Sequence, residues 1–145
     1  MKLWHCAGAR SLRPLWALEE IGLDYELEIL PFPPRMFKRE YLGVNSLGTV
    51  PFLQDGDTEM TESSAICQYL VDRYQRYDFG LQPSHPEYGA YLNWLHHADA
   101  TLAIVRERAA DGTSVERLVC LDAKVTLDDS ALTRHPGLEE LRDPD

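Results

Sequence analysis

A carboxyl and a hydroxyl side chain, Glu62 and Ser63, stand together where a predicted helix begins. The first N–H groups of a helix have no acceptor within it, and the aligned peptide dipoles give that end a positive character. A carboxylate therefore binds well there. Two roles fit this pattern and can coexist. Ser63 can cap the helix beside a surface acid, or the pair can form a subsite for a charged ligand.

A second hydroxyl, Ser11, has a similar place at the start of an earlier predicted helix. An apolar face at helical spacing follows it, and Pro14 falls in the first turn, where a missing N–H costs little. Gly22 is a natural end for this helix. Ser11 can cap the helix, or its hydroxyl can donate to an anion held in front of it. The sequence leaves both roles open.

The elements that must position these side chains alternate between strand and helix. The pattern predicts strands over 2–6, 25–30, 50–53 and 58–60, and helices over 12–21, 35–42 and 63–74. A strand–helix–strand opening predicts a parallel pair, and the turn Asp55-Gly56-Asp57 predicts an antiparallel hairpin. One mixed sheet covered by helices follows.

The overall composition narrows the class of protein. The 145 residues are 44% hydrophobic and 26% charged, which is typical of globular chains, and the formal net charge is −10. This acidity argues against nucleic acid and anionic membranes as partners. No apolar run is long enough to cross a membrane, and the N-terminus does not resemble a signal peptide. The three cysteines, Cys6, Cys67 and Cys120, are far apart and favour a reduced cytoplasmic protein without a metal site.

Two stretches of the chain resemble the glutathione S-transferase family. Residues 44–70 read VNSLGTVPFLQDGDTEMTESSAICQYL and resemble the family's run from an Asn-Pro-x-Gly turn, through Val-Pro, to a Glu-Ser-x-x-Ile helix. Residues 11–23 read SLRPLWALEEIGL and resemble its first helix. The resemblance implies an α/β thioredoxin-like domain of order β-α-β-α-β-β-α over 1–76 that binds glutathione.

The same resemblance implies roles for particular residues in holding glutathione. The bond before Pro51 would be cis, so that the N–H and C=O of Val50 pair with the cysteinyl backbone of glutathione as an added strand does. The γ-glutamyl carboxylate would lie at Ser63, with Glu62 facing the ammonium group. Lys38 would reach the glycyl carboxylate. Without that context, Val50-Pro51 is an ordinary start of a strand and Lys38 belongs to a solvated helix face.

The catalytic group implied by the family is a donor to the glutathione thiolate, since the free thiol is mostly protonated at neutral pH. Ser11 is the only hydroxyl in the first loop and is the predicted catalytic residue. Many serine-type members carry their serine a few residues earlier, where this chain has Gly8, Ala9 and Arg10. Bacterial cysteine-type members have cysteine at the position of Arg10. That arginine can steady a thiolate, or it can be a solvated surface charge.

The remainder of the chain departs from the family pattern. We expect a linker over 77–87 and, over 88–145, a truncated or divergent remnant of the family's helical domain. Its first helix lies over 88–102, and an irregular tail follows Ala103, as an out-of-frame read would produce. Because that domain builds the electrophile pocket and part of the dimer contact, a homodimer would be weakened.

The sequence thus favours a cytoplasmic transferase that conjugates glutathione to a small electrophile, as in detoxification. A non-catalytic glutathione-binding or interaction module, an inactive truncated transferase, and a glutathione-dependent reductase or peroxidase are the alternatives.

Overall fold

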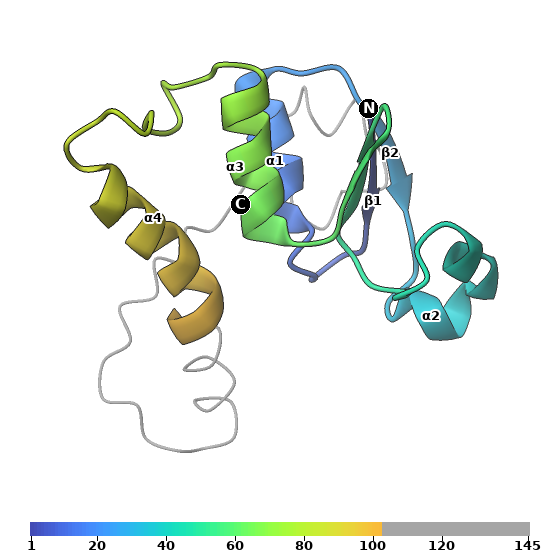
Figure 1. Ribbon diagram of the computed structural model, residues 1–145. Helices are drawn as coiled ribbons and strands as arrows, with labels where there is room; N and C mark the ends of the chain where they lie inside the picture. The colour runs from blue at the N-terminus through green and yellow to red at the C-terminus, as the bar shows by residue number, and fades with distance from the viewer. Residues whose placement is uncertain (103–145) are drawn as a thin grey trace, which may run out of the picture. The chain divides into compact units, whose positions relative to one another are not determined.

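The computed structural model describes residues 1–102, and these belong to two units, the second of which begins at Tyr77. The tail expected beyond Ala103 lies outside the described residues. The first unit has the predicted order β-α-β-α-β-β-α (Figure 1). Its elements are β1 (Lys2–His5), α1 (Leu12–Ile21), β2 (Glu26–Ile29), α2 (Pro34–Phe37), the 3-10 helix η1 (Arg39–Gly43), β3 (Phe52–Asp55), β4 (Thr58–Met60) and α3 (Ser63–Arg73). The thioredoxin-like fold class predicted from the sequence is confirmed.

The four strands form one mixed sheet in the order β2-β1-β3-β4. β1 runs parallel to β2, with Lys2 opposite Glu26, and antiparallel to β3, with Trp4 opposite Phe52. β3 and β4 form the predicted hairpin around Gly56. Because β1 and β3 run in opposite directions, the chain leaves β1 at the same edge of the sheet where it enters β3.

Two predicted boundaries differ from the observed ones for local reasons. The helix expected over 35–42 is divided into α2 and η1, because Lys38 between them has φ −140° and ψ 73°, outside the helical region. The strand expected from Val50 begins at Phe52, because Pro51 has no N–H to give to a ladder.

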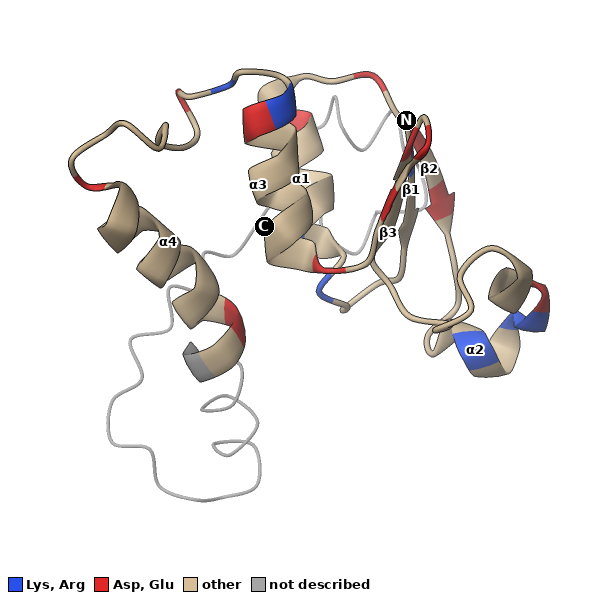
Figure 2. Cartoon of the chain, in the orientation of Figure 1, with Lys and Arg blue, Asp and Glu red and all other residues tan. Residues whose placement is uncertain are grey.

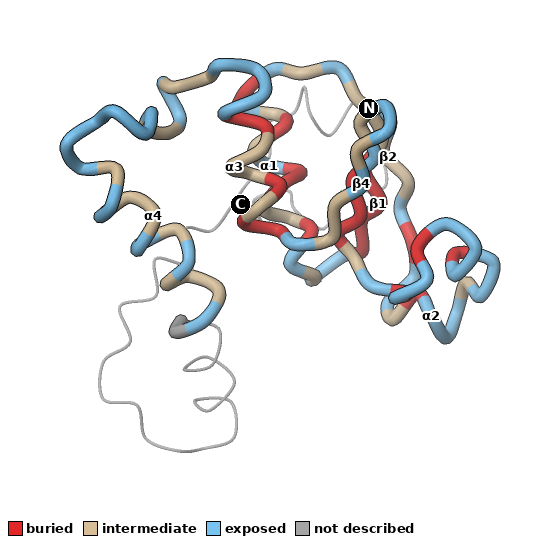
Figure 3. The backbone as a smooth tube through the Cα atoms, in the orientation of Figure 1, coloured by how far each residue is buried: buried red, intermediate tan, exposed pale blue. Residues whose placement is uncertain are grey.

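One face of the sheet is covered by α1 and α3, which pack against each other (Figure 1). Side chains alternate along a strand, so Leu3 and His5 of β1 point to this face while Trp4 and Cys6 point to the other. The buried residues of α1, α3 and β1 form the interior between these layers (Figure 3). The leucine and isoleucine side chains with no exposed surface among the described residues are Leu3, Leu15, Leu18, Leu53, Ile66 and Leu70. Each buried leucine contributes about 2 kcal/mol of hydrophobic stabilisation.

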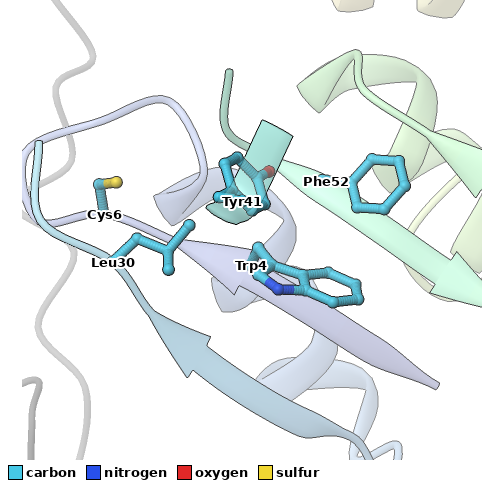
Figure 4. Close-up of a cluster of buried hydrophobic side chains, with 5 residues drawn as sticks. All are labelled: Trp4, Cys6, Leu30, Tyr41 and Phe52. Atoms are coloured by element: carbon cyan, nitrogen blue, oxygen red, sulfur yellow. The ribbon is translucent and has the colours of Figure 1, made fainter. Parts of the chain in front are cut away.

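The opposite face carries a smaller apolar cluster made of Trp4, Cys6, Leu30, Tyr41 and Phe52 (Figure 4). The rings of Trp4 and Phe52 lie 5.2 Å apart between centroids. Ala9, from the loop after β1, and Val50, from the turn before β3, both pack against this cluster. The cluster therefore anchors two segments that are far apart in the sequence.

The second unit begins with residues that have no regular secondary structure over 77–87. The predicted helix is present as α4 (Tyr88–His97), followed by a short π-helical segment, η2 (Ala98–Leu102). Among residues 1–102, no helix is long and apolar enough to span a membrane.

The turn that leads into β3 depends on a glycine with a left-handed backbone. Gly48 has φ +60°, and a Cβ built there would lie 2.7 Å from Cβ of Arg35 and 2.8 Å from Cδ2 of Leu42. Gly56 has nearly the same φ, +59°, and nothing lies within 4 Å of its would-be Cβ. Both glycines have a left-handed backbone, but only at Gly48 would an added Cβ also clash with neighbouring side chains.

We predict that Gly48→Ala destabilises the protein more than Gly56→Ala. The left-handed backbone alone costs an alanine about 1 kcal/mol, which is the whole effect expected at Gly56. The clash at Gly48 adds about 1–3 kcal/mol to that cost. Urea unfolding followed by circular dichroism measures both. Equal losses in the two variants would contradict the close packing of the turn against α2 and η1.

Candidate functional site

The loop after β1 and the turn before β3 lie next to each other at one edge of the sheet. The loop holds residues 7–10, and Ala9 from it rests on the same apolar cluster as Val50. Ala7, Gly8 and Arg10 are exposed, and Arg10 has the only polar side chain in this loop. A molecule paired with the backbone of Val50 would therefore lie beside the exposed loop.

The Val50-Pro51 turn has the geometry that the resemblance implied. Its peptide bond is cis, as predicted. The preceding carbonyl, of Thr49, accepts hydrogen bonds from the Tyr41 hydroxyl at 2.8 Å and from Nδ2 of the buried Asn45 at 2.9 Å. Within residues 1–102, no hydrogen bond is made to the backbone of Val50. Two buried side chains thus fix the turn, and the Val50 N–H and C=O have no hydrogen-bond partner among residues 1–102.

Ser63 is the first residue of α3, and Glu62 is the flanking cap residue, so the expected assignment of Ser63 as the cap is corrected by one position. The first helical bond runs from the Ile66 N–H to the Glu62 carbonyl, and the Glu62 side chain makes no capping bond. Glu62 is exposed, whereas Ser63 is only 5% exposed. Ser63 and the exposed carboxylate thus stand side by side at the start of α3.

Arg13 is a member of this site that sequence reasoning missed. Its Nη1 donates a hydrogen bond to Oγ of Ser63 at 3.2 Å, from the first turn of α1 to the first turn of α3. The only signal in the sequence was an arginine at the start of a helix. The partners are 50 positions apart and are brought together only by the packing of α1 on α3, so no local pattern shows the contact.

Ser11 points into the protein, away from the loop surface. Its side chain has no exposed surface, and Oγ lies 2.8 Å from Nδ1 of His5. Oγ also accepts the Cys6 N–H at 3.2 Å and lies 3.4 Å from the Cys6 carbonyl. Ser11 occupies the N-cap position of α1, but its side chain makes no capping bond. The catalytic role predicted for Ser11 needs an exposed hydroxyl, and this placement does not supply one.

The groups around Ser11 are neutral at physiological pH. Burial lowers the pKa of His5 to about 4, against a smaller opposing effect of its hydrogen bond with Ser11. Burial raises the pKa of the Cys6 thiol to about 11. The Cys6 Sγ lies 3.6 Å from the Pro31 carbonyl. Cys6 is therefore a packed thiol and not a nucleophile.

Lys38 forms an ion pair with Glu28, a residue of strand β2. Its Nζ lies 3.3 Å from Oε1 of Glu28, and Lys2 approaches the other oxygen of that carboxylate at 3.2 Å. The hydrogen bonds from Lys2 and then from Lys38 hold the pKa of Glu28 below its usual value. Figure 2 shows basic residues on α2 and on the turn that follows it, and acidic residues on β2. An anion at Lys38 would have to share its ammonium group with Glu28.

In the part of the chain that the structure describes, no group of three or more His, Cys, Asp or Glu side chains is placed to hold a metal ion. The groups at this edge of the sheet are hydrogen-bond donors, the guanidinium of Arg10 and the carboxylate of Glu62.

Comparison with known proteins agrees with this arrangement. Residues 8–73 match the family model of the glutathione S-transferase N-terminal domain. Glutathione S-transferase 1 of Zea mays is 45% identical over 73 residues, covering 49% of this chain and 34% of the maize protein. Human glutathione S-transferase theta-2 is 42% identical over 83 residues, covering 54% of this chain and 33% of its own length. The chain thus spans about a third of the length of these curated relatives.

Solved structures give the same result. The crystal structure of human theta-2 in complex with glutathione and an unknown ligand has a TM-score of 0.54 at 34% identity, covering 68% of this chain and 42% of that one. BphK, a bacterial transferase solved as a ternary complex, has a TM-score of 0.65 at 31% identity, covering 79% of this chain and 59% of its own. The fold and the site together define a thioredoxin-like domain in which the Val50-Pro51 turn lies beside the exposed loop of residues 7–10. The N-terminal domain of this chain belongs to the glutathione S-transferase family.

The buried His5 predicts a stability that depends on pH. Its folded pKa of about 4 lies below the ordinary 6.5, so the unfolded chain binds the proton more readily. Neutral His5 contributes to the free energy of unfolding in full above pH 6.5. This contribution is lost as the pH falls toward 4, and the loss is on the order of 3 kcal/mol.

We expect His5→Leu to be less stable than the wild type at pH 7, because Ser11 loses a partner, but to have the flatter profile between pH 6.5 and 4. Urea unfolding at each pH measures both proteins. Parallel profiles would show that His5 is not buried in its neutral form.

Proposed function

We propose that this chain binds glutathione and transfers its thiolate to a small electrophile. The observation that carries the proposal is the backbone of Val50, which has no hydrogen-bond partner among residues 1–102 and lies beside the exposed loop of residues 7–10. The glutathione present in the human theta-2 structure supports the choice of ligand.

The bound glutathione would extend along one edge of the domain. Val50 pairs with its cysteinyl backbone, and Pro51 holds that pairing edge in place. The γ-glutamyl carboxylate binds at Ser63, and Glu62 takes the ammonium group beside it. The glycyl carboxylate extends toward Lys38, which shares its charge with Glu28. Each charged group of the tripeptide thus meets a side chain of the opposite charge or a hydroxyl donor.

The sulfur of glutathione would face the loop of residues 7–10. In the reaction the thiol gives its proton to solvent water, the sulfur forms a bond to carbon, and the leaving group departs with the electron pair of the bond that breaks. Arg10 supplies positive potential that favours the thiolate before this step. Ser11 acts from behind the loop, by tying it to β1 through Cys6 and His5.

A non-catalytic glutathione-binding module is the second candidate function. The burial of the Ser11 hydroxyl favours it, because this hydroxyl is the one that the loop and the start of α1 would offer to a thiolate. Retention of glutathione without turnover distinguishes this module from a transferase.

We further propose that the chain is cytoplasmic and that copies of it associate as a weakened homodimer. Exposed apolar side chains between β2 and β3 support self-association, because burying them against a second copy is favourable. They are Phe32, Met36, Phe37 and Leu47, each more than half exposed, at 64%, 66%, 66% and 61%.

Calorimetric titration with glutathione tests the binding site. We expect Ser63→Ala to weaken binding about tenfold or more, because a hydrogen bond to a charged carboxylate is lost. Ser84→Ala, which alters an exposed serine of the linker, should bind as the wild type does. A wild-type protein that is folded and does not bind glutathione would contradict the proposed function.

Conjugation to an aryl halide, followed against pH, tests the assignment of the loop. Arg10→Gln should move the rise in rate toward higher pH, because the thiolate loses a positive neighbour. Ser11→Ala should lower the free energy of unfolding by about 1–3 kcal/mol, since buried partners are left unpaired, and should leave glutathione affinity nearly unchanged. Normal stability of Ser11→Ala with abolished turnover would instead place its hydroxyl at the sulfur.

A further inference from the structure

We propose that Arg13 is a positioning residue that makes the site selective for the free α-amino-acid end of the γ-glutamyl group. The inference rests on the proposed function and assigns a role within the same site. It concerns the pair formed by Arg13 and Ser63, together with the carboxylate of Glu62.

The pair joins two helices at their first turns. Nη1 of Arg13 lies 3.2 Å from Oγ of Ser63, and α1 packs against α3 along the same face of the sheet. Ser63 is 5% exposed and Arg13 is half-buried. Water therefore screens this contact less than it screens a surface pair. The charge of Arg13 consequently has a greater effect on a neighbouring ligand.

The direction of the hydrogen bond sets the direction of the serine hydroxyl. A guanidinium group has five N–H donors and no acceptor, and it keeps its charge at any physiological pH. Oγ of Ser63 is thus the acceptor from Arg13, and its own proton has to go to another group. An ionised carboxylate accepts and does not donate, so it is the matching partner for that proton.

The charges on either side of Ser63 match a zwitterion. Glu62 is exposed and next to Ser63 in the chain, so it would repel a carboxylate bound there. The guanidinium of Arg13, which is hydrogen-bonded to Ser63, offsets that repulsion. Consider a ligand that carries a carboxylate and an ammonium group on one carbon. Its carboxylate would lie toward Ser63 and Arg13, and its ammonium group would lie toward Glu62. This is the α-amino-acid end of glutathione.

Titration with a ligand pair isolates the contribution of that carboxylate. Glutathione is compared with γ-aminobutyryl-cysteinyl-glycine, which lacks only this group. We expect the wild type to prefer glutathione by about tenfold or more, and Arg13→Met to bind the two within about twofold of each other. Arg13→Lys should recover part of the preference, since it keeps the charge but not the planar donor group.

Two controls separate this role from a purely structural one. Arg73→Met removes the same charge at the far end of α3, about 15 Å along the helix, and should keep the wild-type preference. In the unmodified protein the preference should fall as salt is raised, which needs no variant to fold.

A folded Arg13→Met variant that keeps the wild-type preference would overturn the inference while leaving glutathione binding intact. A preference in the wild type that does not change with salt would overturn it as well. A wild-type protein that binds neither ligand would overturn the proposed function and, with it, this inference.

Discussion

A single buried hydroxyl determines which groups this domain presents at the edge of its sheet. Oγ of Ser11 accepts the Cys6 N–H and meets the imidazole of His5 in a part of the interior without exposed surface. Breaking either of these two hydrogen bonds would leave a buried polar atom unpaired at a cost of about 1–3 kcal/mol, so the bonds hold the three groups in place. The loop of residues 7–10 is consequently drawn against the end of β1, with Arg10 outward and Ser11 inward.

The sheet brings the other half of the site to this loop. β1 and β3 are antiparallel neighbours, so the chain leaves one strand where it enters the other. Ala9 from the loop and Val50 from the turn before β3 both pack against the apolar cluster that includes Trp4, Tyr41 and Phe52. Packing therefore sets the position of the loop, while hydrogen bonds from Tyr41 and Asn45 to Thr49 set the direction of the Val50 backbone.

Periodicity and turn chemistry were sufficient to predict the order of elements, because apolar spacing and Gly22 are local signals. The cis bond at Pro51 followed from the family resemblance and not from the residues themselves. The break at Lys38 was missed because its backbone angles depend on how α2 and η1 pack. The contact between Arg13 and Ser63 and the inward turn of Ser11 depend on partners in other elements. No local pattern contains that information, and composition adds none.

In the proposed complex, glutathione lies across the edge formed by the loop of residues 7–10, Val50 and Ser63, with Ser11 behind it. A crystal structure of the chain with glutathione tests this most directly. We expect the cysteinyl backbone to be paired with Val50, the γ-glutamyl carboxylate to lie within hydrogen-bond distance of Ser63, and Oγ of Ser11 still to be bonded to His5. Glutathione bound elsewhere, or a Ser11 hydroxyl turned outward onto the sulfur, would contradict the account.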